Sequence, residues 1–370
     1  MGWAAVRGPA FALALCLAHS AWAIDADVPT ITSPGDIASR RATLIEQVWG
    51  TSTLPTTLST VTTGISNPFP GYNVARVDQY VASMSNGQSN TSNLYLATSP
   101  NNGRLVILNP GHQDTCDWTA FSSGYRMQLV LQALLAAGYS VFAMNMPGCG
   151  DATEHVMLFT SYGNAAMQYF FEPAIQAMNY WDAHAMFSRY DMTGLSGGAW
   201  TTTILPALDT RVKISIPVAG SWPGITWNFG CADSTCGDGC NTVACAEQNW
   251  TNFYTVAGNI DIYVMASYGP NRRQFQILNY SDDCCFGNAF FVGSGAASFY
   301  GVTYPVYLRN YMVSVKQLEP TIMPVHYDGM MDYIADQHQI STNAQQVILS
   351  ILASVGPGNA GGGRRLLHMS

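Results

Sequence analysis

Charged side chains are scarce in this chain. Asp, Glu, Lys and Arg make up 10% of its 370 residues, against roughly a quarter in an ordinary soluble protein. The few charges leave a formal net charge of -8. Such a surface offers little attraction to phosphate groups, so the composition argues against nucleic acid and against an anionic membrane as partners.

A run of apolar residues long enough to cross a membrane is also missing. The N-terminal stretch 1–23 comes nearest, with a cation at Arg7, an apolar stretch from Phe11 to Leu17 and a small-residue end at Ala21-Trp22-Ala23. A membrane-spanning helix needs about 20 apolar residues, so this stretch has the form of a cleavable signal peptide. We therefore expect cleavage after Ala23 and a secreted protein, extracellular or periplasmic.

The CxxC pairs of common zinc modules are absent too. Of nine cysteines, removal of 1–23 takes away Cys16 and leaves an even number. Four of these fall in CADSTCGDGCNTVAC, residues 231–245, where thiolates could in principle close a zinc site. The spacing and an oxidising compartment favour disulfides instead. We expect no metal and no other cofactor.

Sequence patterns divide the mature chain into three parts. Residues 24–71 are rich in Thr, Ser and Pro and show little periodicity apart from a possible helix at 37–48, so we expect an extension packed on the surface of the next part. Residues 72–355 form one continuous pattern of strands and helices, interrupted by a cysteine-rich insertion at 222–258. The glycine-rich tail 356–370 is predicted to be disordered.

The middle part opens with a predicted hairpin and then alternates strands with helices. Strands are expected at 73–84, 93–99, 104–110, 139–148, 190–196, 212–221, 272–281 and 321–328. Helices are expected at 127–138, 164–186, 198–209, 306–318 and 341–354. This order predicts an α/β fold, with a mostly parallel central sheet flanked by helices.

One short motif carries most of the chemical information. GLSGG, residues 194–198, follows a predicted strand and precedes a predicted helix. In a G-x-S-x-G turn of this kind the strand reverses sharply into the helix and holds the serine at the apex in a strained conformation. The pattern predicts Ser196 as a nucleophile.

A serine hydroxyl needs a base to take its proton. His338 lies between the last predicted strand and the last predicted helix, where a loop can carry it over the sheet to Ser196. His326 is the alternative, although it falls within a predicted strand. His155, expected in a loop, and His184, expected on a helix, are assigned structural or surface roles.

The base needs an acid to orient it, supplied between the serine and that histidine at the end of a strand. Asp282 and Asp283 follow the predicted strand 272–281. Asp282 is favoured because it is closer to the strand, and the sequence does not separate the two.

The reaction also needs backbone N–H groups for the oxyanion that forms on the substrate. One is expected from Gly197, directly after the nucleophile, and the other from His112 in the loop after strand 104–110. Cys116 and Cys149 follow strands expected to be neighbours, so a disulfide between them would brace this loop.

Together these residues resemble the α/β-hydrolase superfamily. The resemblance covers about residues 72–355 and rests on the opening hairpin, the parallel sheet, GLSGG, and the order Ser196, Asp282, His338. It implies an α/β-hydrolase fold, here stabilised by disulfides. NPGHQ, residues 109–113, and the glycines after the serine look most like dienelactone hydrolases and prolyl oligopeptidases. One departure is that Asn109-Pro110 stands where a histidine usually precedes the oxyanion glycine.

Three functions compete on these residues. The leading hypothesis is a secreted serine hydrolase that cleaves carboxylic esters, either small molecules or polymers, through an acyl-enzyme. A secreted serine peptidase or aminoacyl amidase would use the same triad. A binding protein without catalysis is the third possibility, because a fold does not dictate a function.

Overall fold

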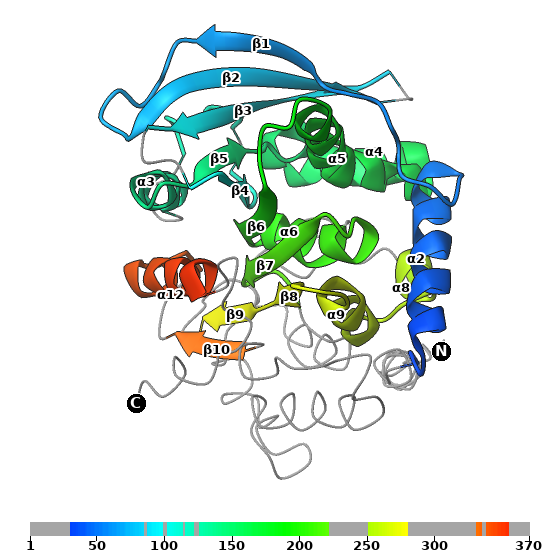
Figure 1. Ribbon diagram of the computed structural model, residues 1–370. Coiled ribbons are helices and arrows are strands. Elements are labelled where there is room, and N and C mark those ends of the chain that lie inside the picture. Colours follow the sequence, from blue (N-terminus) through cyan, green and yellow to red (C-terminus); the bar gives the residue numbers. More distant parts are fainter. Residues whose placement is uncertain are drawn as a thin grey trace, which may run out of the picture.

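The computed structural model describes residues 30–84, 87–98, 102–113, 115–121, 126–221, 251–279, 331–334 and 338–354. A ten-stranded sheet runs through the molecule in the order β1-β2-β3-β5-β4-β6-β7-β9-β10, with β8 paired to β7 (Figure 1). The predicted signal peptide, the segment 231–245, the helix at 306–318, the strand at 321–328 and the tail 356–370 lie outside the described residues.

The first three strands form an antiparallel edge of the sheet. β1 (Thr60–Ile65) pairs with β2 (Val74–Ser83), and β2 pairs with β3 (Ser89–Ala97) along its whole length. The predicted hairpin is therefore confirmed. Strand β1 was not predicted, and it makes part of the segment 24–71 an integral strand of the sheet rather than a surface layer.

The remaining strands are parallel to one another. They are β4 (Arg104–Asn109), β5 (Ser140–Ala143), β6 (Arg189–Leu195), β7 (Val212–Val218), β8 (Arg273–Gln274), β9 (Gln276–Asn279) and β10 (Met331–Ile334). Each pairing among them is parallel, and β3 joins β5 antiparallel. The predicted mostly parallel sheet is confirmed. Parallel strands end at one edge of a sheet, so the C-terminal ends of β4, β6, β9 and β10 lie at the same edge.

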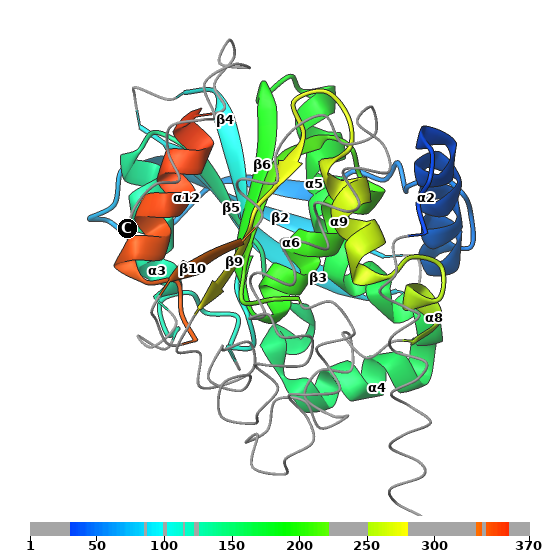
Figure 2. The same ribbon diagram turned by 90° about the horizontal axis from the view of Figure 1, so that it is seen from below.

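Helices cover both faces of the sheet. On one face lie α3 (Met127–Ala136) and α12 (Thr342–Ser354), and on the other lie α5 (Gln168–Ala183), α6 (Gly197–Leu208) and α9 (Asn259–Ser267) (Figure 2). Farther out are α2 (Pro34–Trp49), near the expected 37–48, and the short α8 (Thr251–Tyr254).

Besides β1, other elements differ from the sequence predictions, among them α9, which lies where no helix was expected. Helix α4 (Ala152–Tyr162) occupies a stretch where a loop was expected, and the 3-10 turn η2 (Gly163–Met167) links it to α5. The last described strand is β10, which begins after the predicted strand at 321–328 ends. It is four residues long and pairs with β9, more than fifty residues earlier in the chain, so local periodicity gave little sign of it.

Helix α6 forms the centre of the core, with all of its residues buried. The hydroxyl groups of its three consecutive threonines are hydrogen-bonded despite their burial, because each donates to the backbone carbonyl four residues earlier, at 2.8 to 3.3 Å. Strand β4 is buried throughout as well. Burial on both faces is typical of a central parallel strand.

A buried ion pair links the strands that end at the site. The Asp191 carboxylate on β6 accepts from Arg104 Nη2 on β4 at 2.5 Å and from Arg189 Nε at 2.8 Å. Arg104 also donates to the Leu352 carbonyl of α12 at 2.7 Å. This cluster therefore joins β4, β6 and α12.

Among the residues that the structure describes, no helix has the length and apolar character needed to cross a membrane.

Candidate active site

Ser196 occupies the turn between β6 and α6. Its backbone has φ 56° and ψ -127°, a region that glycine populates and other residues enter only under strain. Two hydrogen bonds hold the turn: Ser196 N donates to Val218 O of β7 at 3.1 Å, and Trp200 N donates to Ser196 O at 2.9 Å. The predicted sharp reversal at GLSGG is therefore present.

The glycines on either side of Ser196 are required by close backbone contacts. A Cβ atom at Gly198 would lie 2.1 Å from Pro110 O, and one at Gly194 would lie 2.7 Å from Asn109 O. Both distances are far below van der Waals contact, so only glycine lets β6 and α6 approach the end of β4. The cluster of small residues is a packing requirement of the turn.

The loop after β4 lies against the serine. A Cβ atom at Gly111 would lie 2.7 Å from Ser196 Cβ and 3.4 Å from its Oγ. The next residue, His112, places its imidazole beside Gly197, where an added Cβ atom would lie 2.8 Å from His112 Cε1. The structure thus brings Ser196, Gly197 and His112 together. The assignment of the two N–H groups to an oxyanion stays a prediction.

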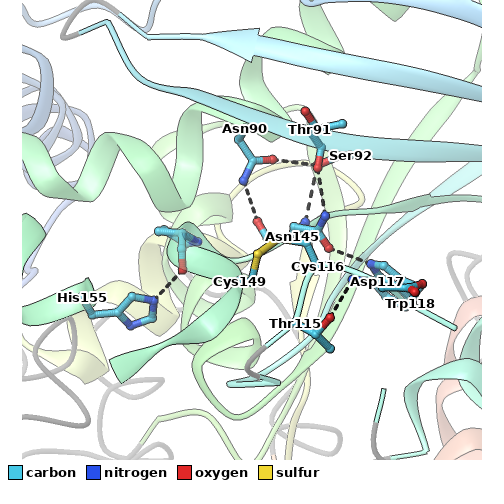
Figure 3. Close-up of a disulfide and its surroundings, with 11 residues drawn as sticks. Asn90, Thr91, Ser92, Thr115, Cys116, Asp117, Trp118, Asn145, Cys149 and His155 are labelled. Carbon is cyan, nitrogen blue, oxygen red and sulfur yellow. Dashed lines mark hydrogen bonds between the residues drawn. A yellow bond between two sulfur atoms is a disulfide. The ribbon is translucent and has the colours of Figure 1, made fainter. Parts of the chain in front are cut away.

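A disulfide fastens this loop to the next strand connection. Cys116 and Cys149 are bonded, with their Cα atoms 4.8 Å apart (Figure 3). The sequence left the pairing of the cysteines open, and the structure shows this pair to be the bridge that would brace the loop. Cys149 lies in the 3-10 turn η1 (Pro147–Gly150), which also packs against the loop, since a Cβ atom at Gly150 would lie 2.9 Å from His112 Cα.

Asn145, between β5 and η1, provides a second attachment. Its side chain accepts from Trp118 Nε1 at 2.8 Å and donates to Thr91 O at 3.0 Å, while its carbonyl accepts from Asn90 Nδ2 at 2.9 Å (Figure 3). These bonds join the loop after β4 to β3. The disulfide and this network hold the loop from two sides.

His338 follows β10 and precedes α12, and its side chain is buried. Because β10 is parallel to β9 and β9 to β7, the His338 loop begins at the same edge of the sheet as Ser196. The two candidate acids, Asp282 and Asp283, come shortly after the end of β9 and lie outside the described residues, as does His326.

The structure corrects the expectation for His155. It lies in α4 rather than in a loop, is fully buried, and contacts the imidazole of His112. Sequence reasoning assigned it a structural or surface role with no partner. His184 is the residue that caps the C-terminus of α5, and its Nδ1 lies 2.7 Å from Tyr180 O.

Within the described part of the chain, no group of three or more His, Cys, Asp or Glu side chains could hold a metal ion. The four cysteines of 231–245 fall outside that part.

Comparison with solved structures identifies the fold. A glucuronoyl esterase from Solibacter usitatus superimposes with a TM-score of 0.55 at 12% identity, over 86% of this chain and 92% of that one. A methylesterase superimposes with a TM-score of 0.52 at 12% identity, over 87% of this chain, which spans 63% of the methylesterase's length. No family model and no curated protein sequence matches this chain.

The strand order, the turn at Ser196 and these neighbours define an α/β-hydrolase-type fold. The finer likeness to dienelactone hydrolases and prolyl oligopeptidases stays a prediction.

Proposed function

We propose that this protein is a serine hydrolase that cleaves carboxylic esters, with Ser196 as the nucleophile. The observation that carries the proposal is the backbone of Ser196, held at φ 56° and ψ -127° between β6 and α6. A protein tolerates such a conformation where the surrounding structure enforces it, and this occurs most often at functional sites. The neighbouring solved structures named as esterases support the choice of ester substrates.

In the proposed reaction Ser196 Oγ attacks the ester carbonyl carbon while His338 accepts the hydroxyl proton. The backbone N–H groups of His112 and Gly197 donate to the oxyanion that forms. The tetrahedral intermediate expels the alcohol, which takes the proton from His338, and leaves an acyl group on Ser196. Water, deprotonated by the same histidine, releases the acid. Asp282 is proposed to orient His338, with Asp283 as the alternative.

Ester hydrolysis by purified protein tests the proposal. Substitution of a triad nucleophile or base costs on the order of 10⁶-fold in kcat, so Ser196→Ala and His338→Ala should each reduce turnover of p-nitrophenyl esters to the background rate. Full activity of Ser196→Ala on every ester would refute it. Faster turnover of aminoacyl arylamides than of esters would favour a peptidase or amidase.

The two candidate acids can be separated by a matched pair of variants. Asp282→Asn and Asp283→Asn remove one carboxylate each and keep the side-chain shape. Loss of the orienting acid costs about 10⁴-fold in kcat, so we expect Asp282→Asn to show a loss of that order and Asp283→Asn to retain most activity. The reverse result would assign the role to Asp283.

The proposed place of action is outside the cytoplasm. The supporting observations are the form of residues 1–23 and the disulfide between Cys116 and Cys149, because disulfides persist in oxidising compartments. N-terminal sequencing of secreted protein should begin at Ile24. Retention of the leader on the exported protein would contradict signal cleavage.

A further inference from the structure

Two histidines form a directed pair beside the candidate nucleophile. His112 Nε2 lies 3.3 Å from His155 Nδ1, and His155 Nε2 lies 3.0 Å from Pro147 O. The two ring centroids are 5.0 Å apart. His155 comes from α4 and His112 from the loop after β4, so the pair joins two elements that the chain separates by 43 residues.

The contact with Pro147 fixes where the protons lie. A carbonyl oxygen only accepts, so His155 Nε2 must carry the hydrogen (Figure 3). A neutral imidazole carries one N–H, so a ring with its hydrogen on Nε2 has Nδ1 as an acceptor. His112 must then donate from Nε2. The hydrogen bonds therefore run in one direction, from His112 to His155 to Pro147.

The surroundings of His155 give its ring a fixed position. The ring is fully buried and packs edge-to-face on Phe170, with centroids 5.2 Å apart. Phe170 in turn packs edge-to-face on Trp200 at 5.3 Å, and Trp200 belongs to α6, the helix that begins at Gly197. His155 is thus anchored to the helix that follows the nucleophile.

His112 transmits this position to the site. Its ring covers Gly197, and its Cα atom is held against Gly150. The preceding residue, Gly111, touches Ser196. The two N–H groups proposed to donate to the oxyanion belong to His112 and Gly197. A rotation of the His112 ring would therefore disturb the packing around both of them.

We propose that His155 is a positioning residue: by accepting the hydrogen bond from His112 Nε2 it fixes the tautomer and orientation of that ring, and with them the loop that stabilises the oxyanion. This inference rests on the proposed function. In the proposed reaction His155 makes or breaks no bond to the substrate and acts through His112.

Asparagine and leucine at position 155 have nearly the same shape, and only asparagine can accept a hydrogen bond. In His155→Leu the part-buried His112 Nε2–H loses this acceptor, and the loss of such a hydrogen bond corresponds to roughly a tenfold loss in rate or more. We expect His155→Leu to lower kcat for an ester at pH 8 by about tenfold or more with KM unchanged. His155→Asn should restore most of that loss. His184→Leu, a change at the exposed histidine that caps the C-terminus of α5, should leave kcat unchanged.

The outcomes separate this inference from the proposed function. The wild type and Ser196→Ala are assayed first, and an inactive wild type would refute the proposed function. If the wild type is active through Ser196, equal kcat values for wild type and His155→Leu would overturn the role of His155. Equal losses in His155→Leu and His155→Asn would also overturn it, because packing of the ring would then explain the effect.

A measurement on the unsubstituted protein covers the case in which a variant does not fold. Histidine-selective ¹⁵N NMR at pH 8 distinguishes a protonated from a bare ring nitrogen. We expect His112 and His155 both to carry their proton on Nε2. A proton on His155 Nδ1 would reverse the hydrogen bond and overturn the proposal.

Discussion

Replacing Ser196 by glycine should stabilise the fold relative to replacing it by alanine, although both variants lose the hydroxyl. At φ 56° and ψ -127° a residue other than glycine pays about 1–3 kcal/mol of backbone strain. Glycine also gains freedom in the unfolded chain, which offsets about 0.4–1 kcal/mol of that difference. The free energy of unfolding of Ser196→Gly should therefore exceed that of Ser196→Ala by about 0.5–2 kcal/mol.

Urea unfolding of the unreduced variants measures this difference directly. Ala199→Gly is the matched control, since Ala199 is a buried residue inside α6, where glycine costs about 0.5–1 kcal/mol or more. Ala199→Gly should have a lower free energy of unfolding than the wild type, whereas Ser196→Gly should have a higher one than Ser196→Ala. If Ser196→Gly were less stable than Ser196→Ala, the serine backbone would not be strained and the account of the turn would be wrong.

Three further predictions concern the surroundings of the site. Gly111→Ala places a Cβ atom 2.7 Å from the Cβ atom of Ser196, about 1 Å closer than normal contact. We therefore expect kcat for an ester to fall by about 10²-fold. The control is Gly71→Ala, whose added Cβ atom would have no other atom within 4 Å, and it should leave kcat unchanged. Asp191→Asn leaves the buried Arg104 and the partly buried Arg189 without their carboxylate and should lower the unfolding free energy by about 3–5 kcal/mol, so an unchanged urea midpoint would contradict this cluster. The double variant Cys116→Ser/Cys149→Ser opens a link across 33 residues and should cost about 2–4 kcal/mol by the same assay, with a wild-type midpoint arguing that the bond does not form.

Elements with strong local patterns were predictable from the sequence. Strand β6, the turn at Ser196 and helix α6 follow one another within twenty residues. The turn and the helix each have a signal of their own, small residues at the reversal and a helical period. The expected neighbourhood of two strands made a disulfide between Cys116 and Cys149 possible, although the sequence left the pairing of the cysteines open.

The elements that were missed lack such signals. Strand β1, TVTTGI, is largely exposed and, among the described strands, pairs with β2 alone, so no alternation of apolar residues marked it. Among the α4 residues whose side chains the structure describes, two are buried, and one of them is His155. Because histidine is polar, it breaks the apolar period of the helix. Its contact with His112 depends on the packing of distant segments, which no local pattern encodes.

The central claim is that Ser196 is an activated nucleophile, and covalent labelling tests it most directly. Intact-protein mass would be measured after the unreduced wild type and Ser196→Ala are exposed to a fluorophosphonate. The account predicts a single adduct on the wild type and none on the variant. An unlabelled, correctly folded wild type, or equal labelling of both proteins, would contradict it.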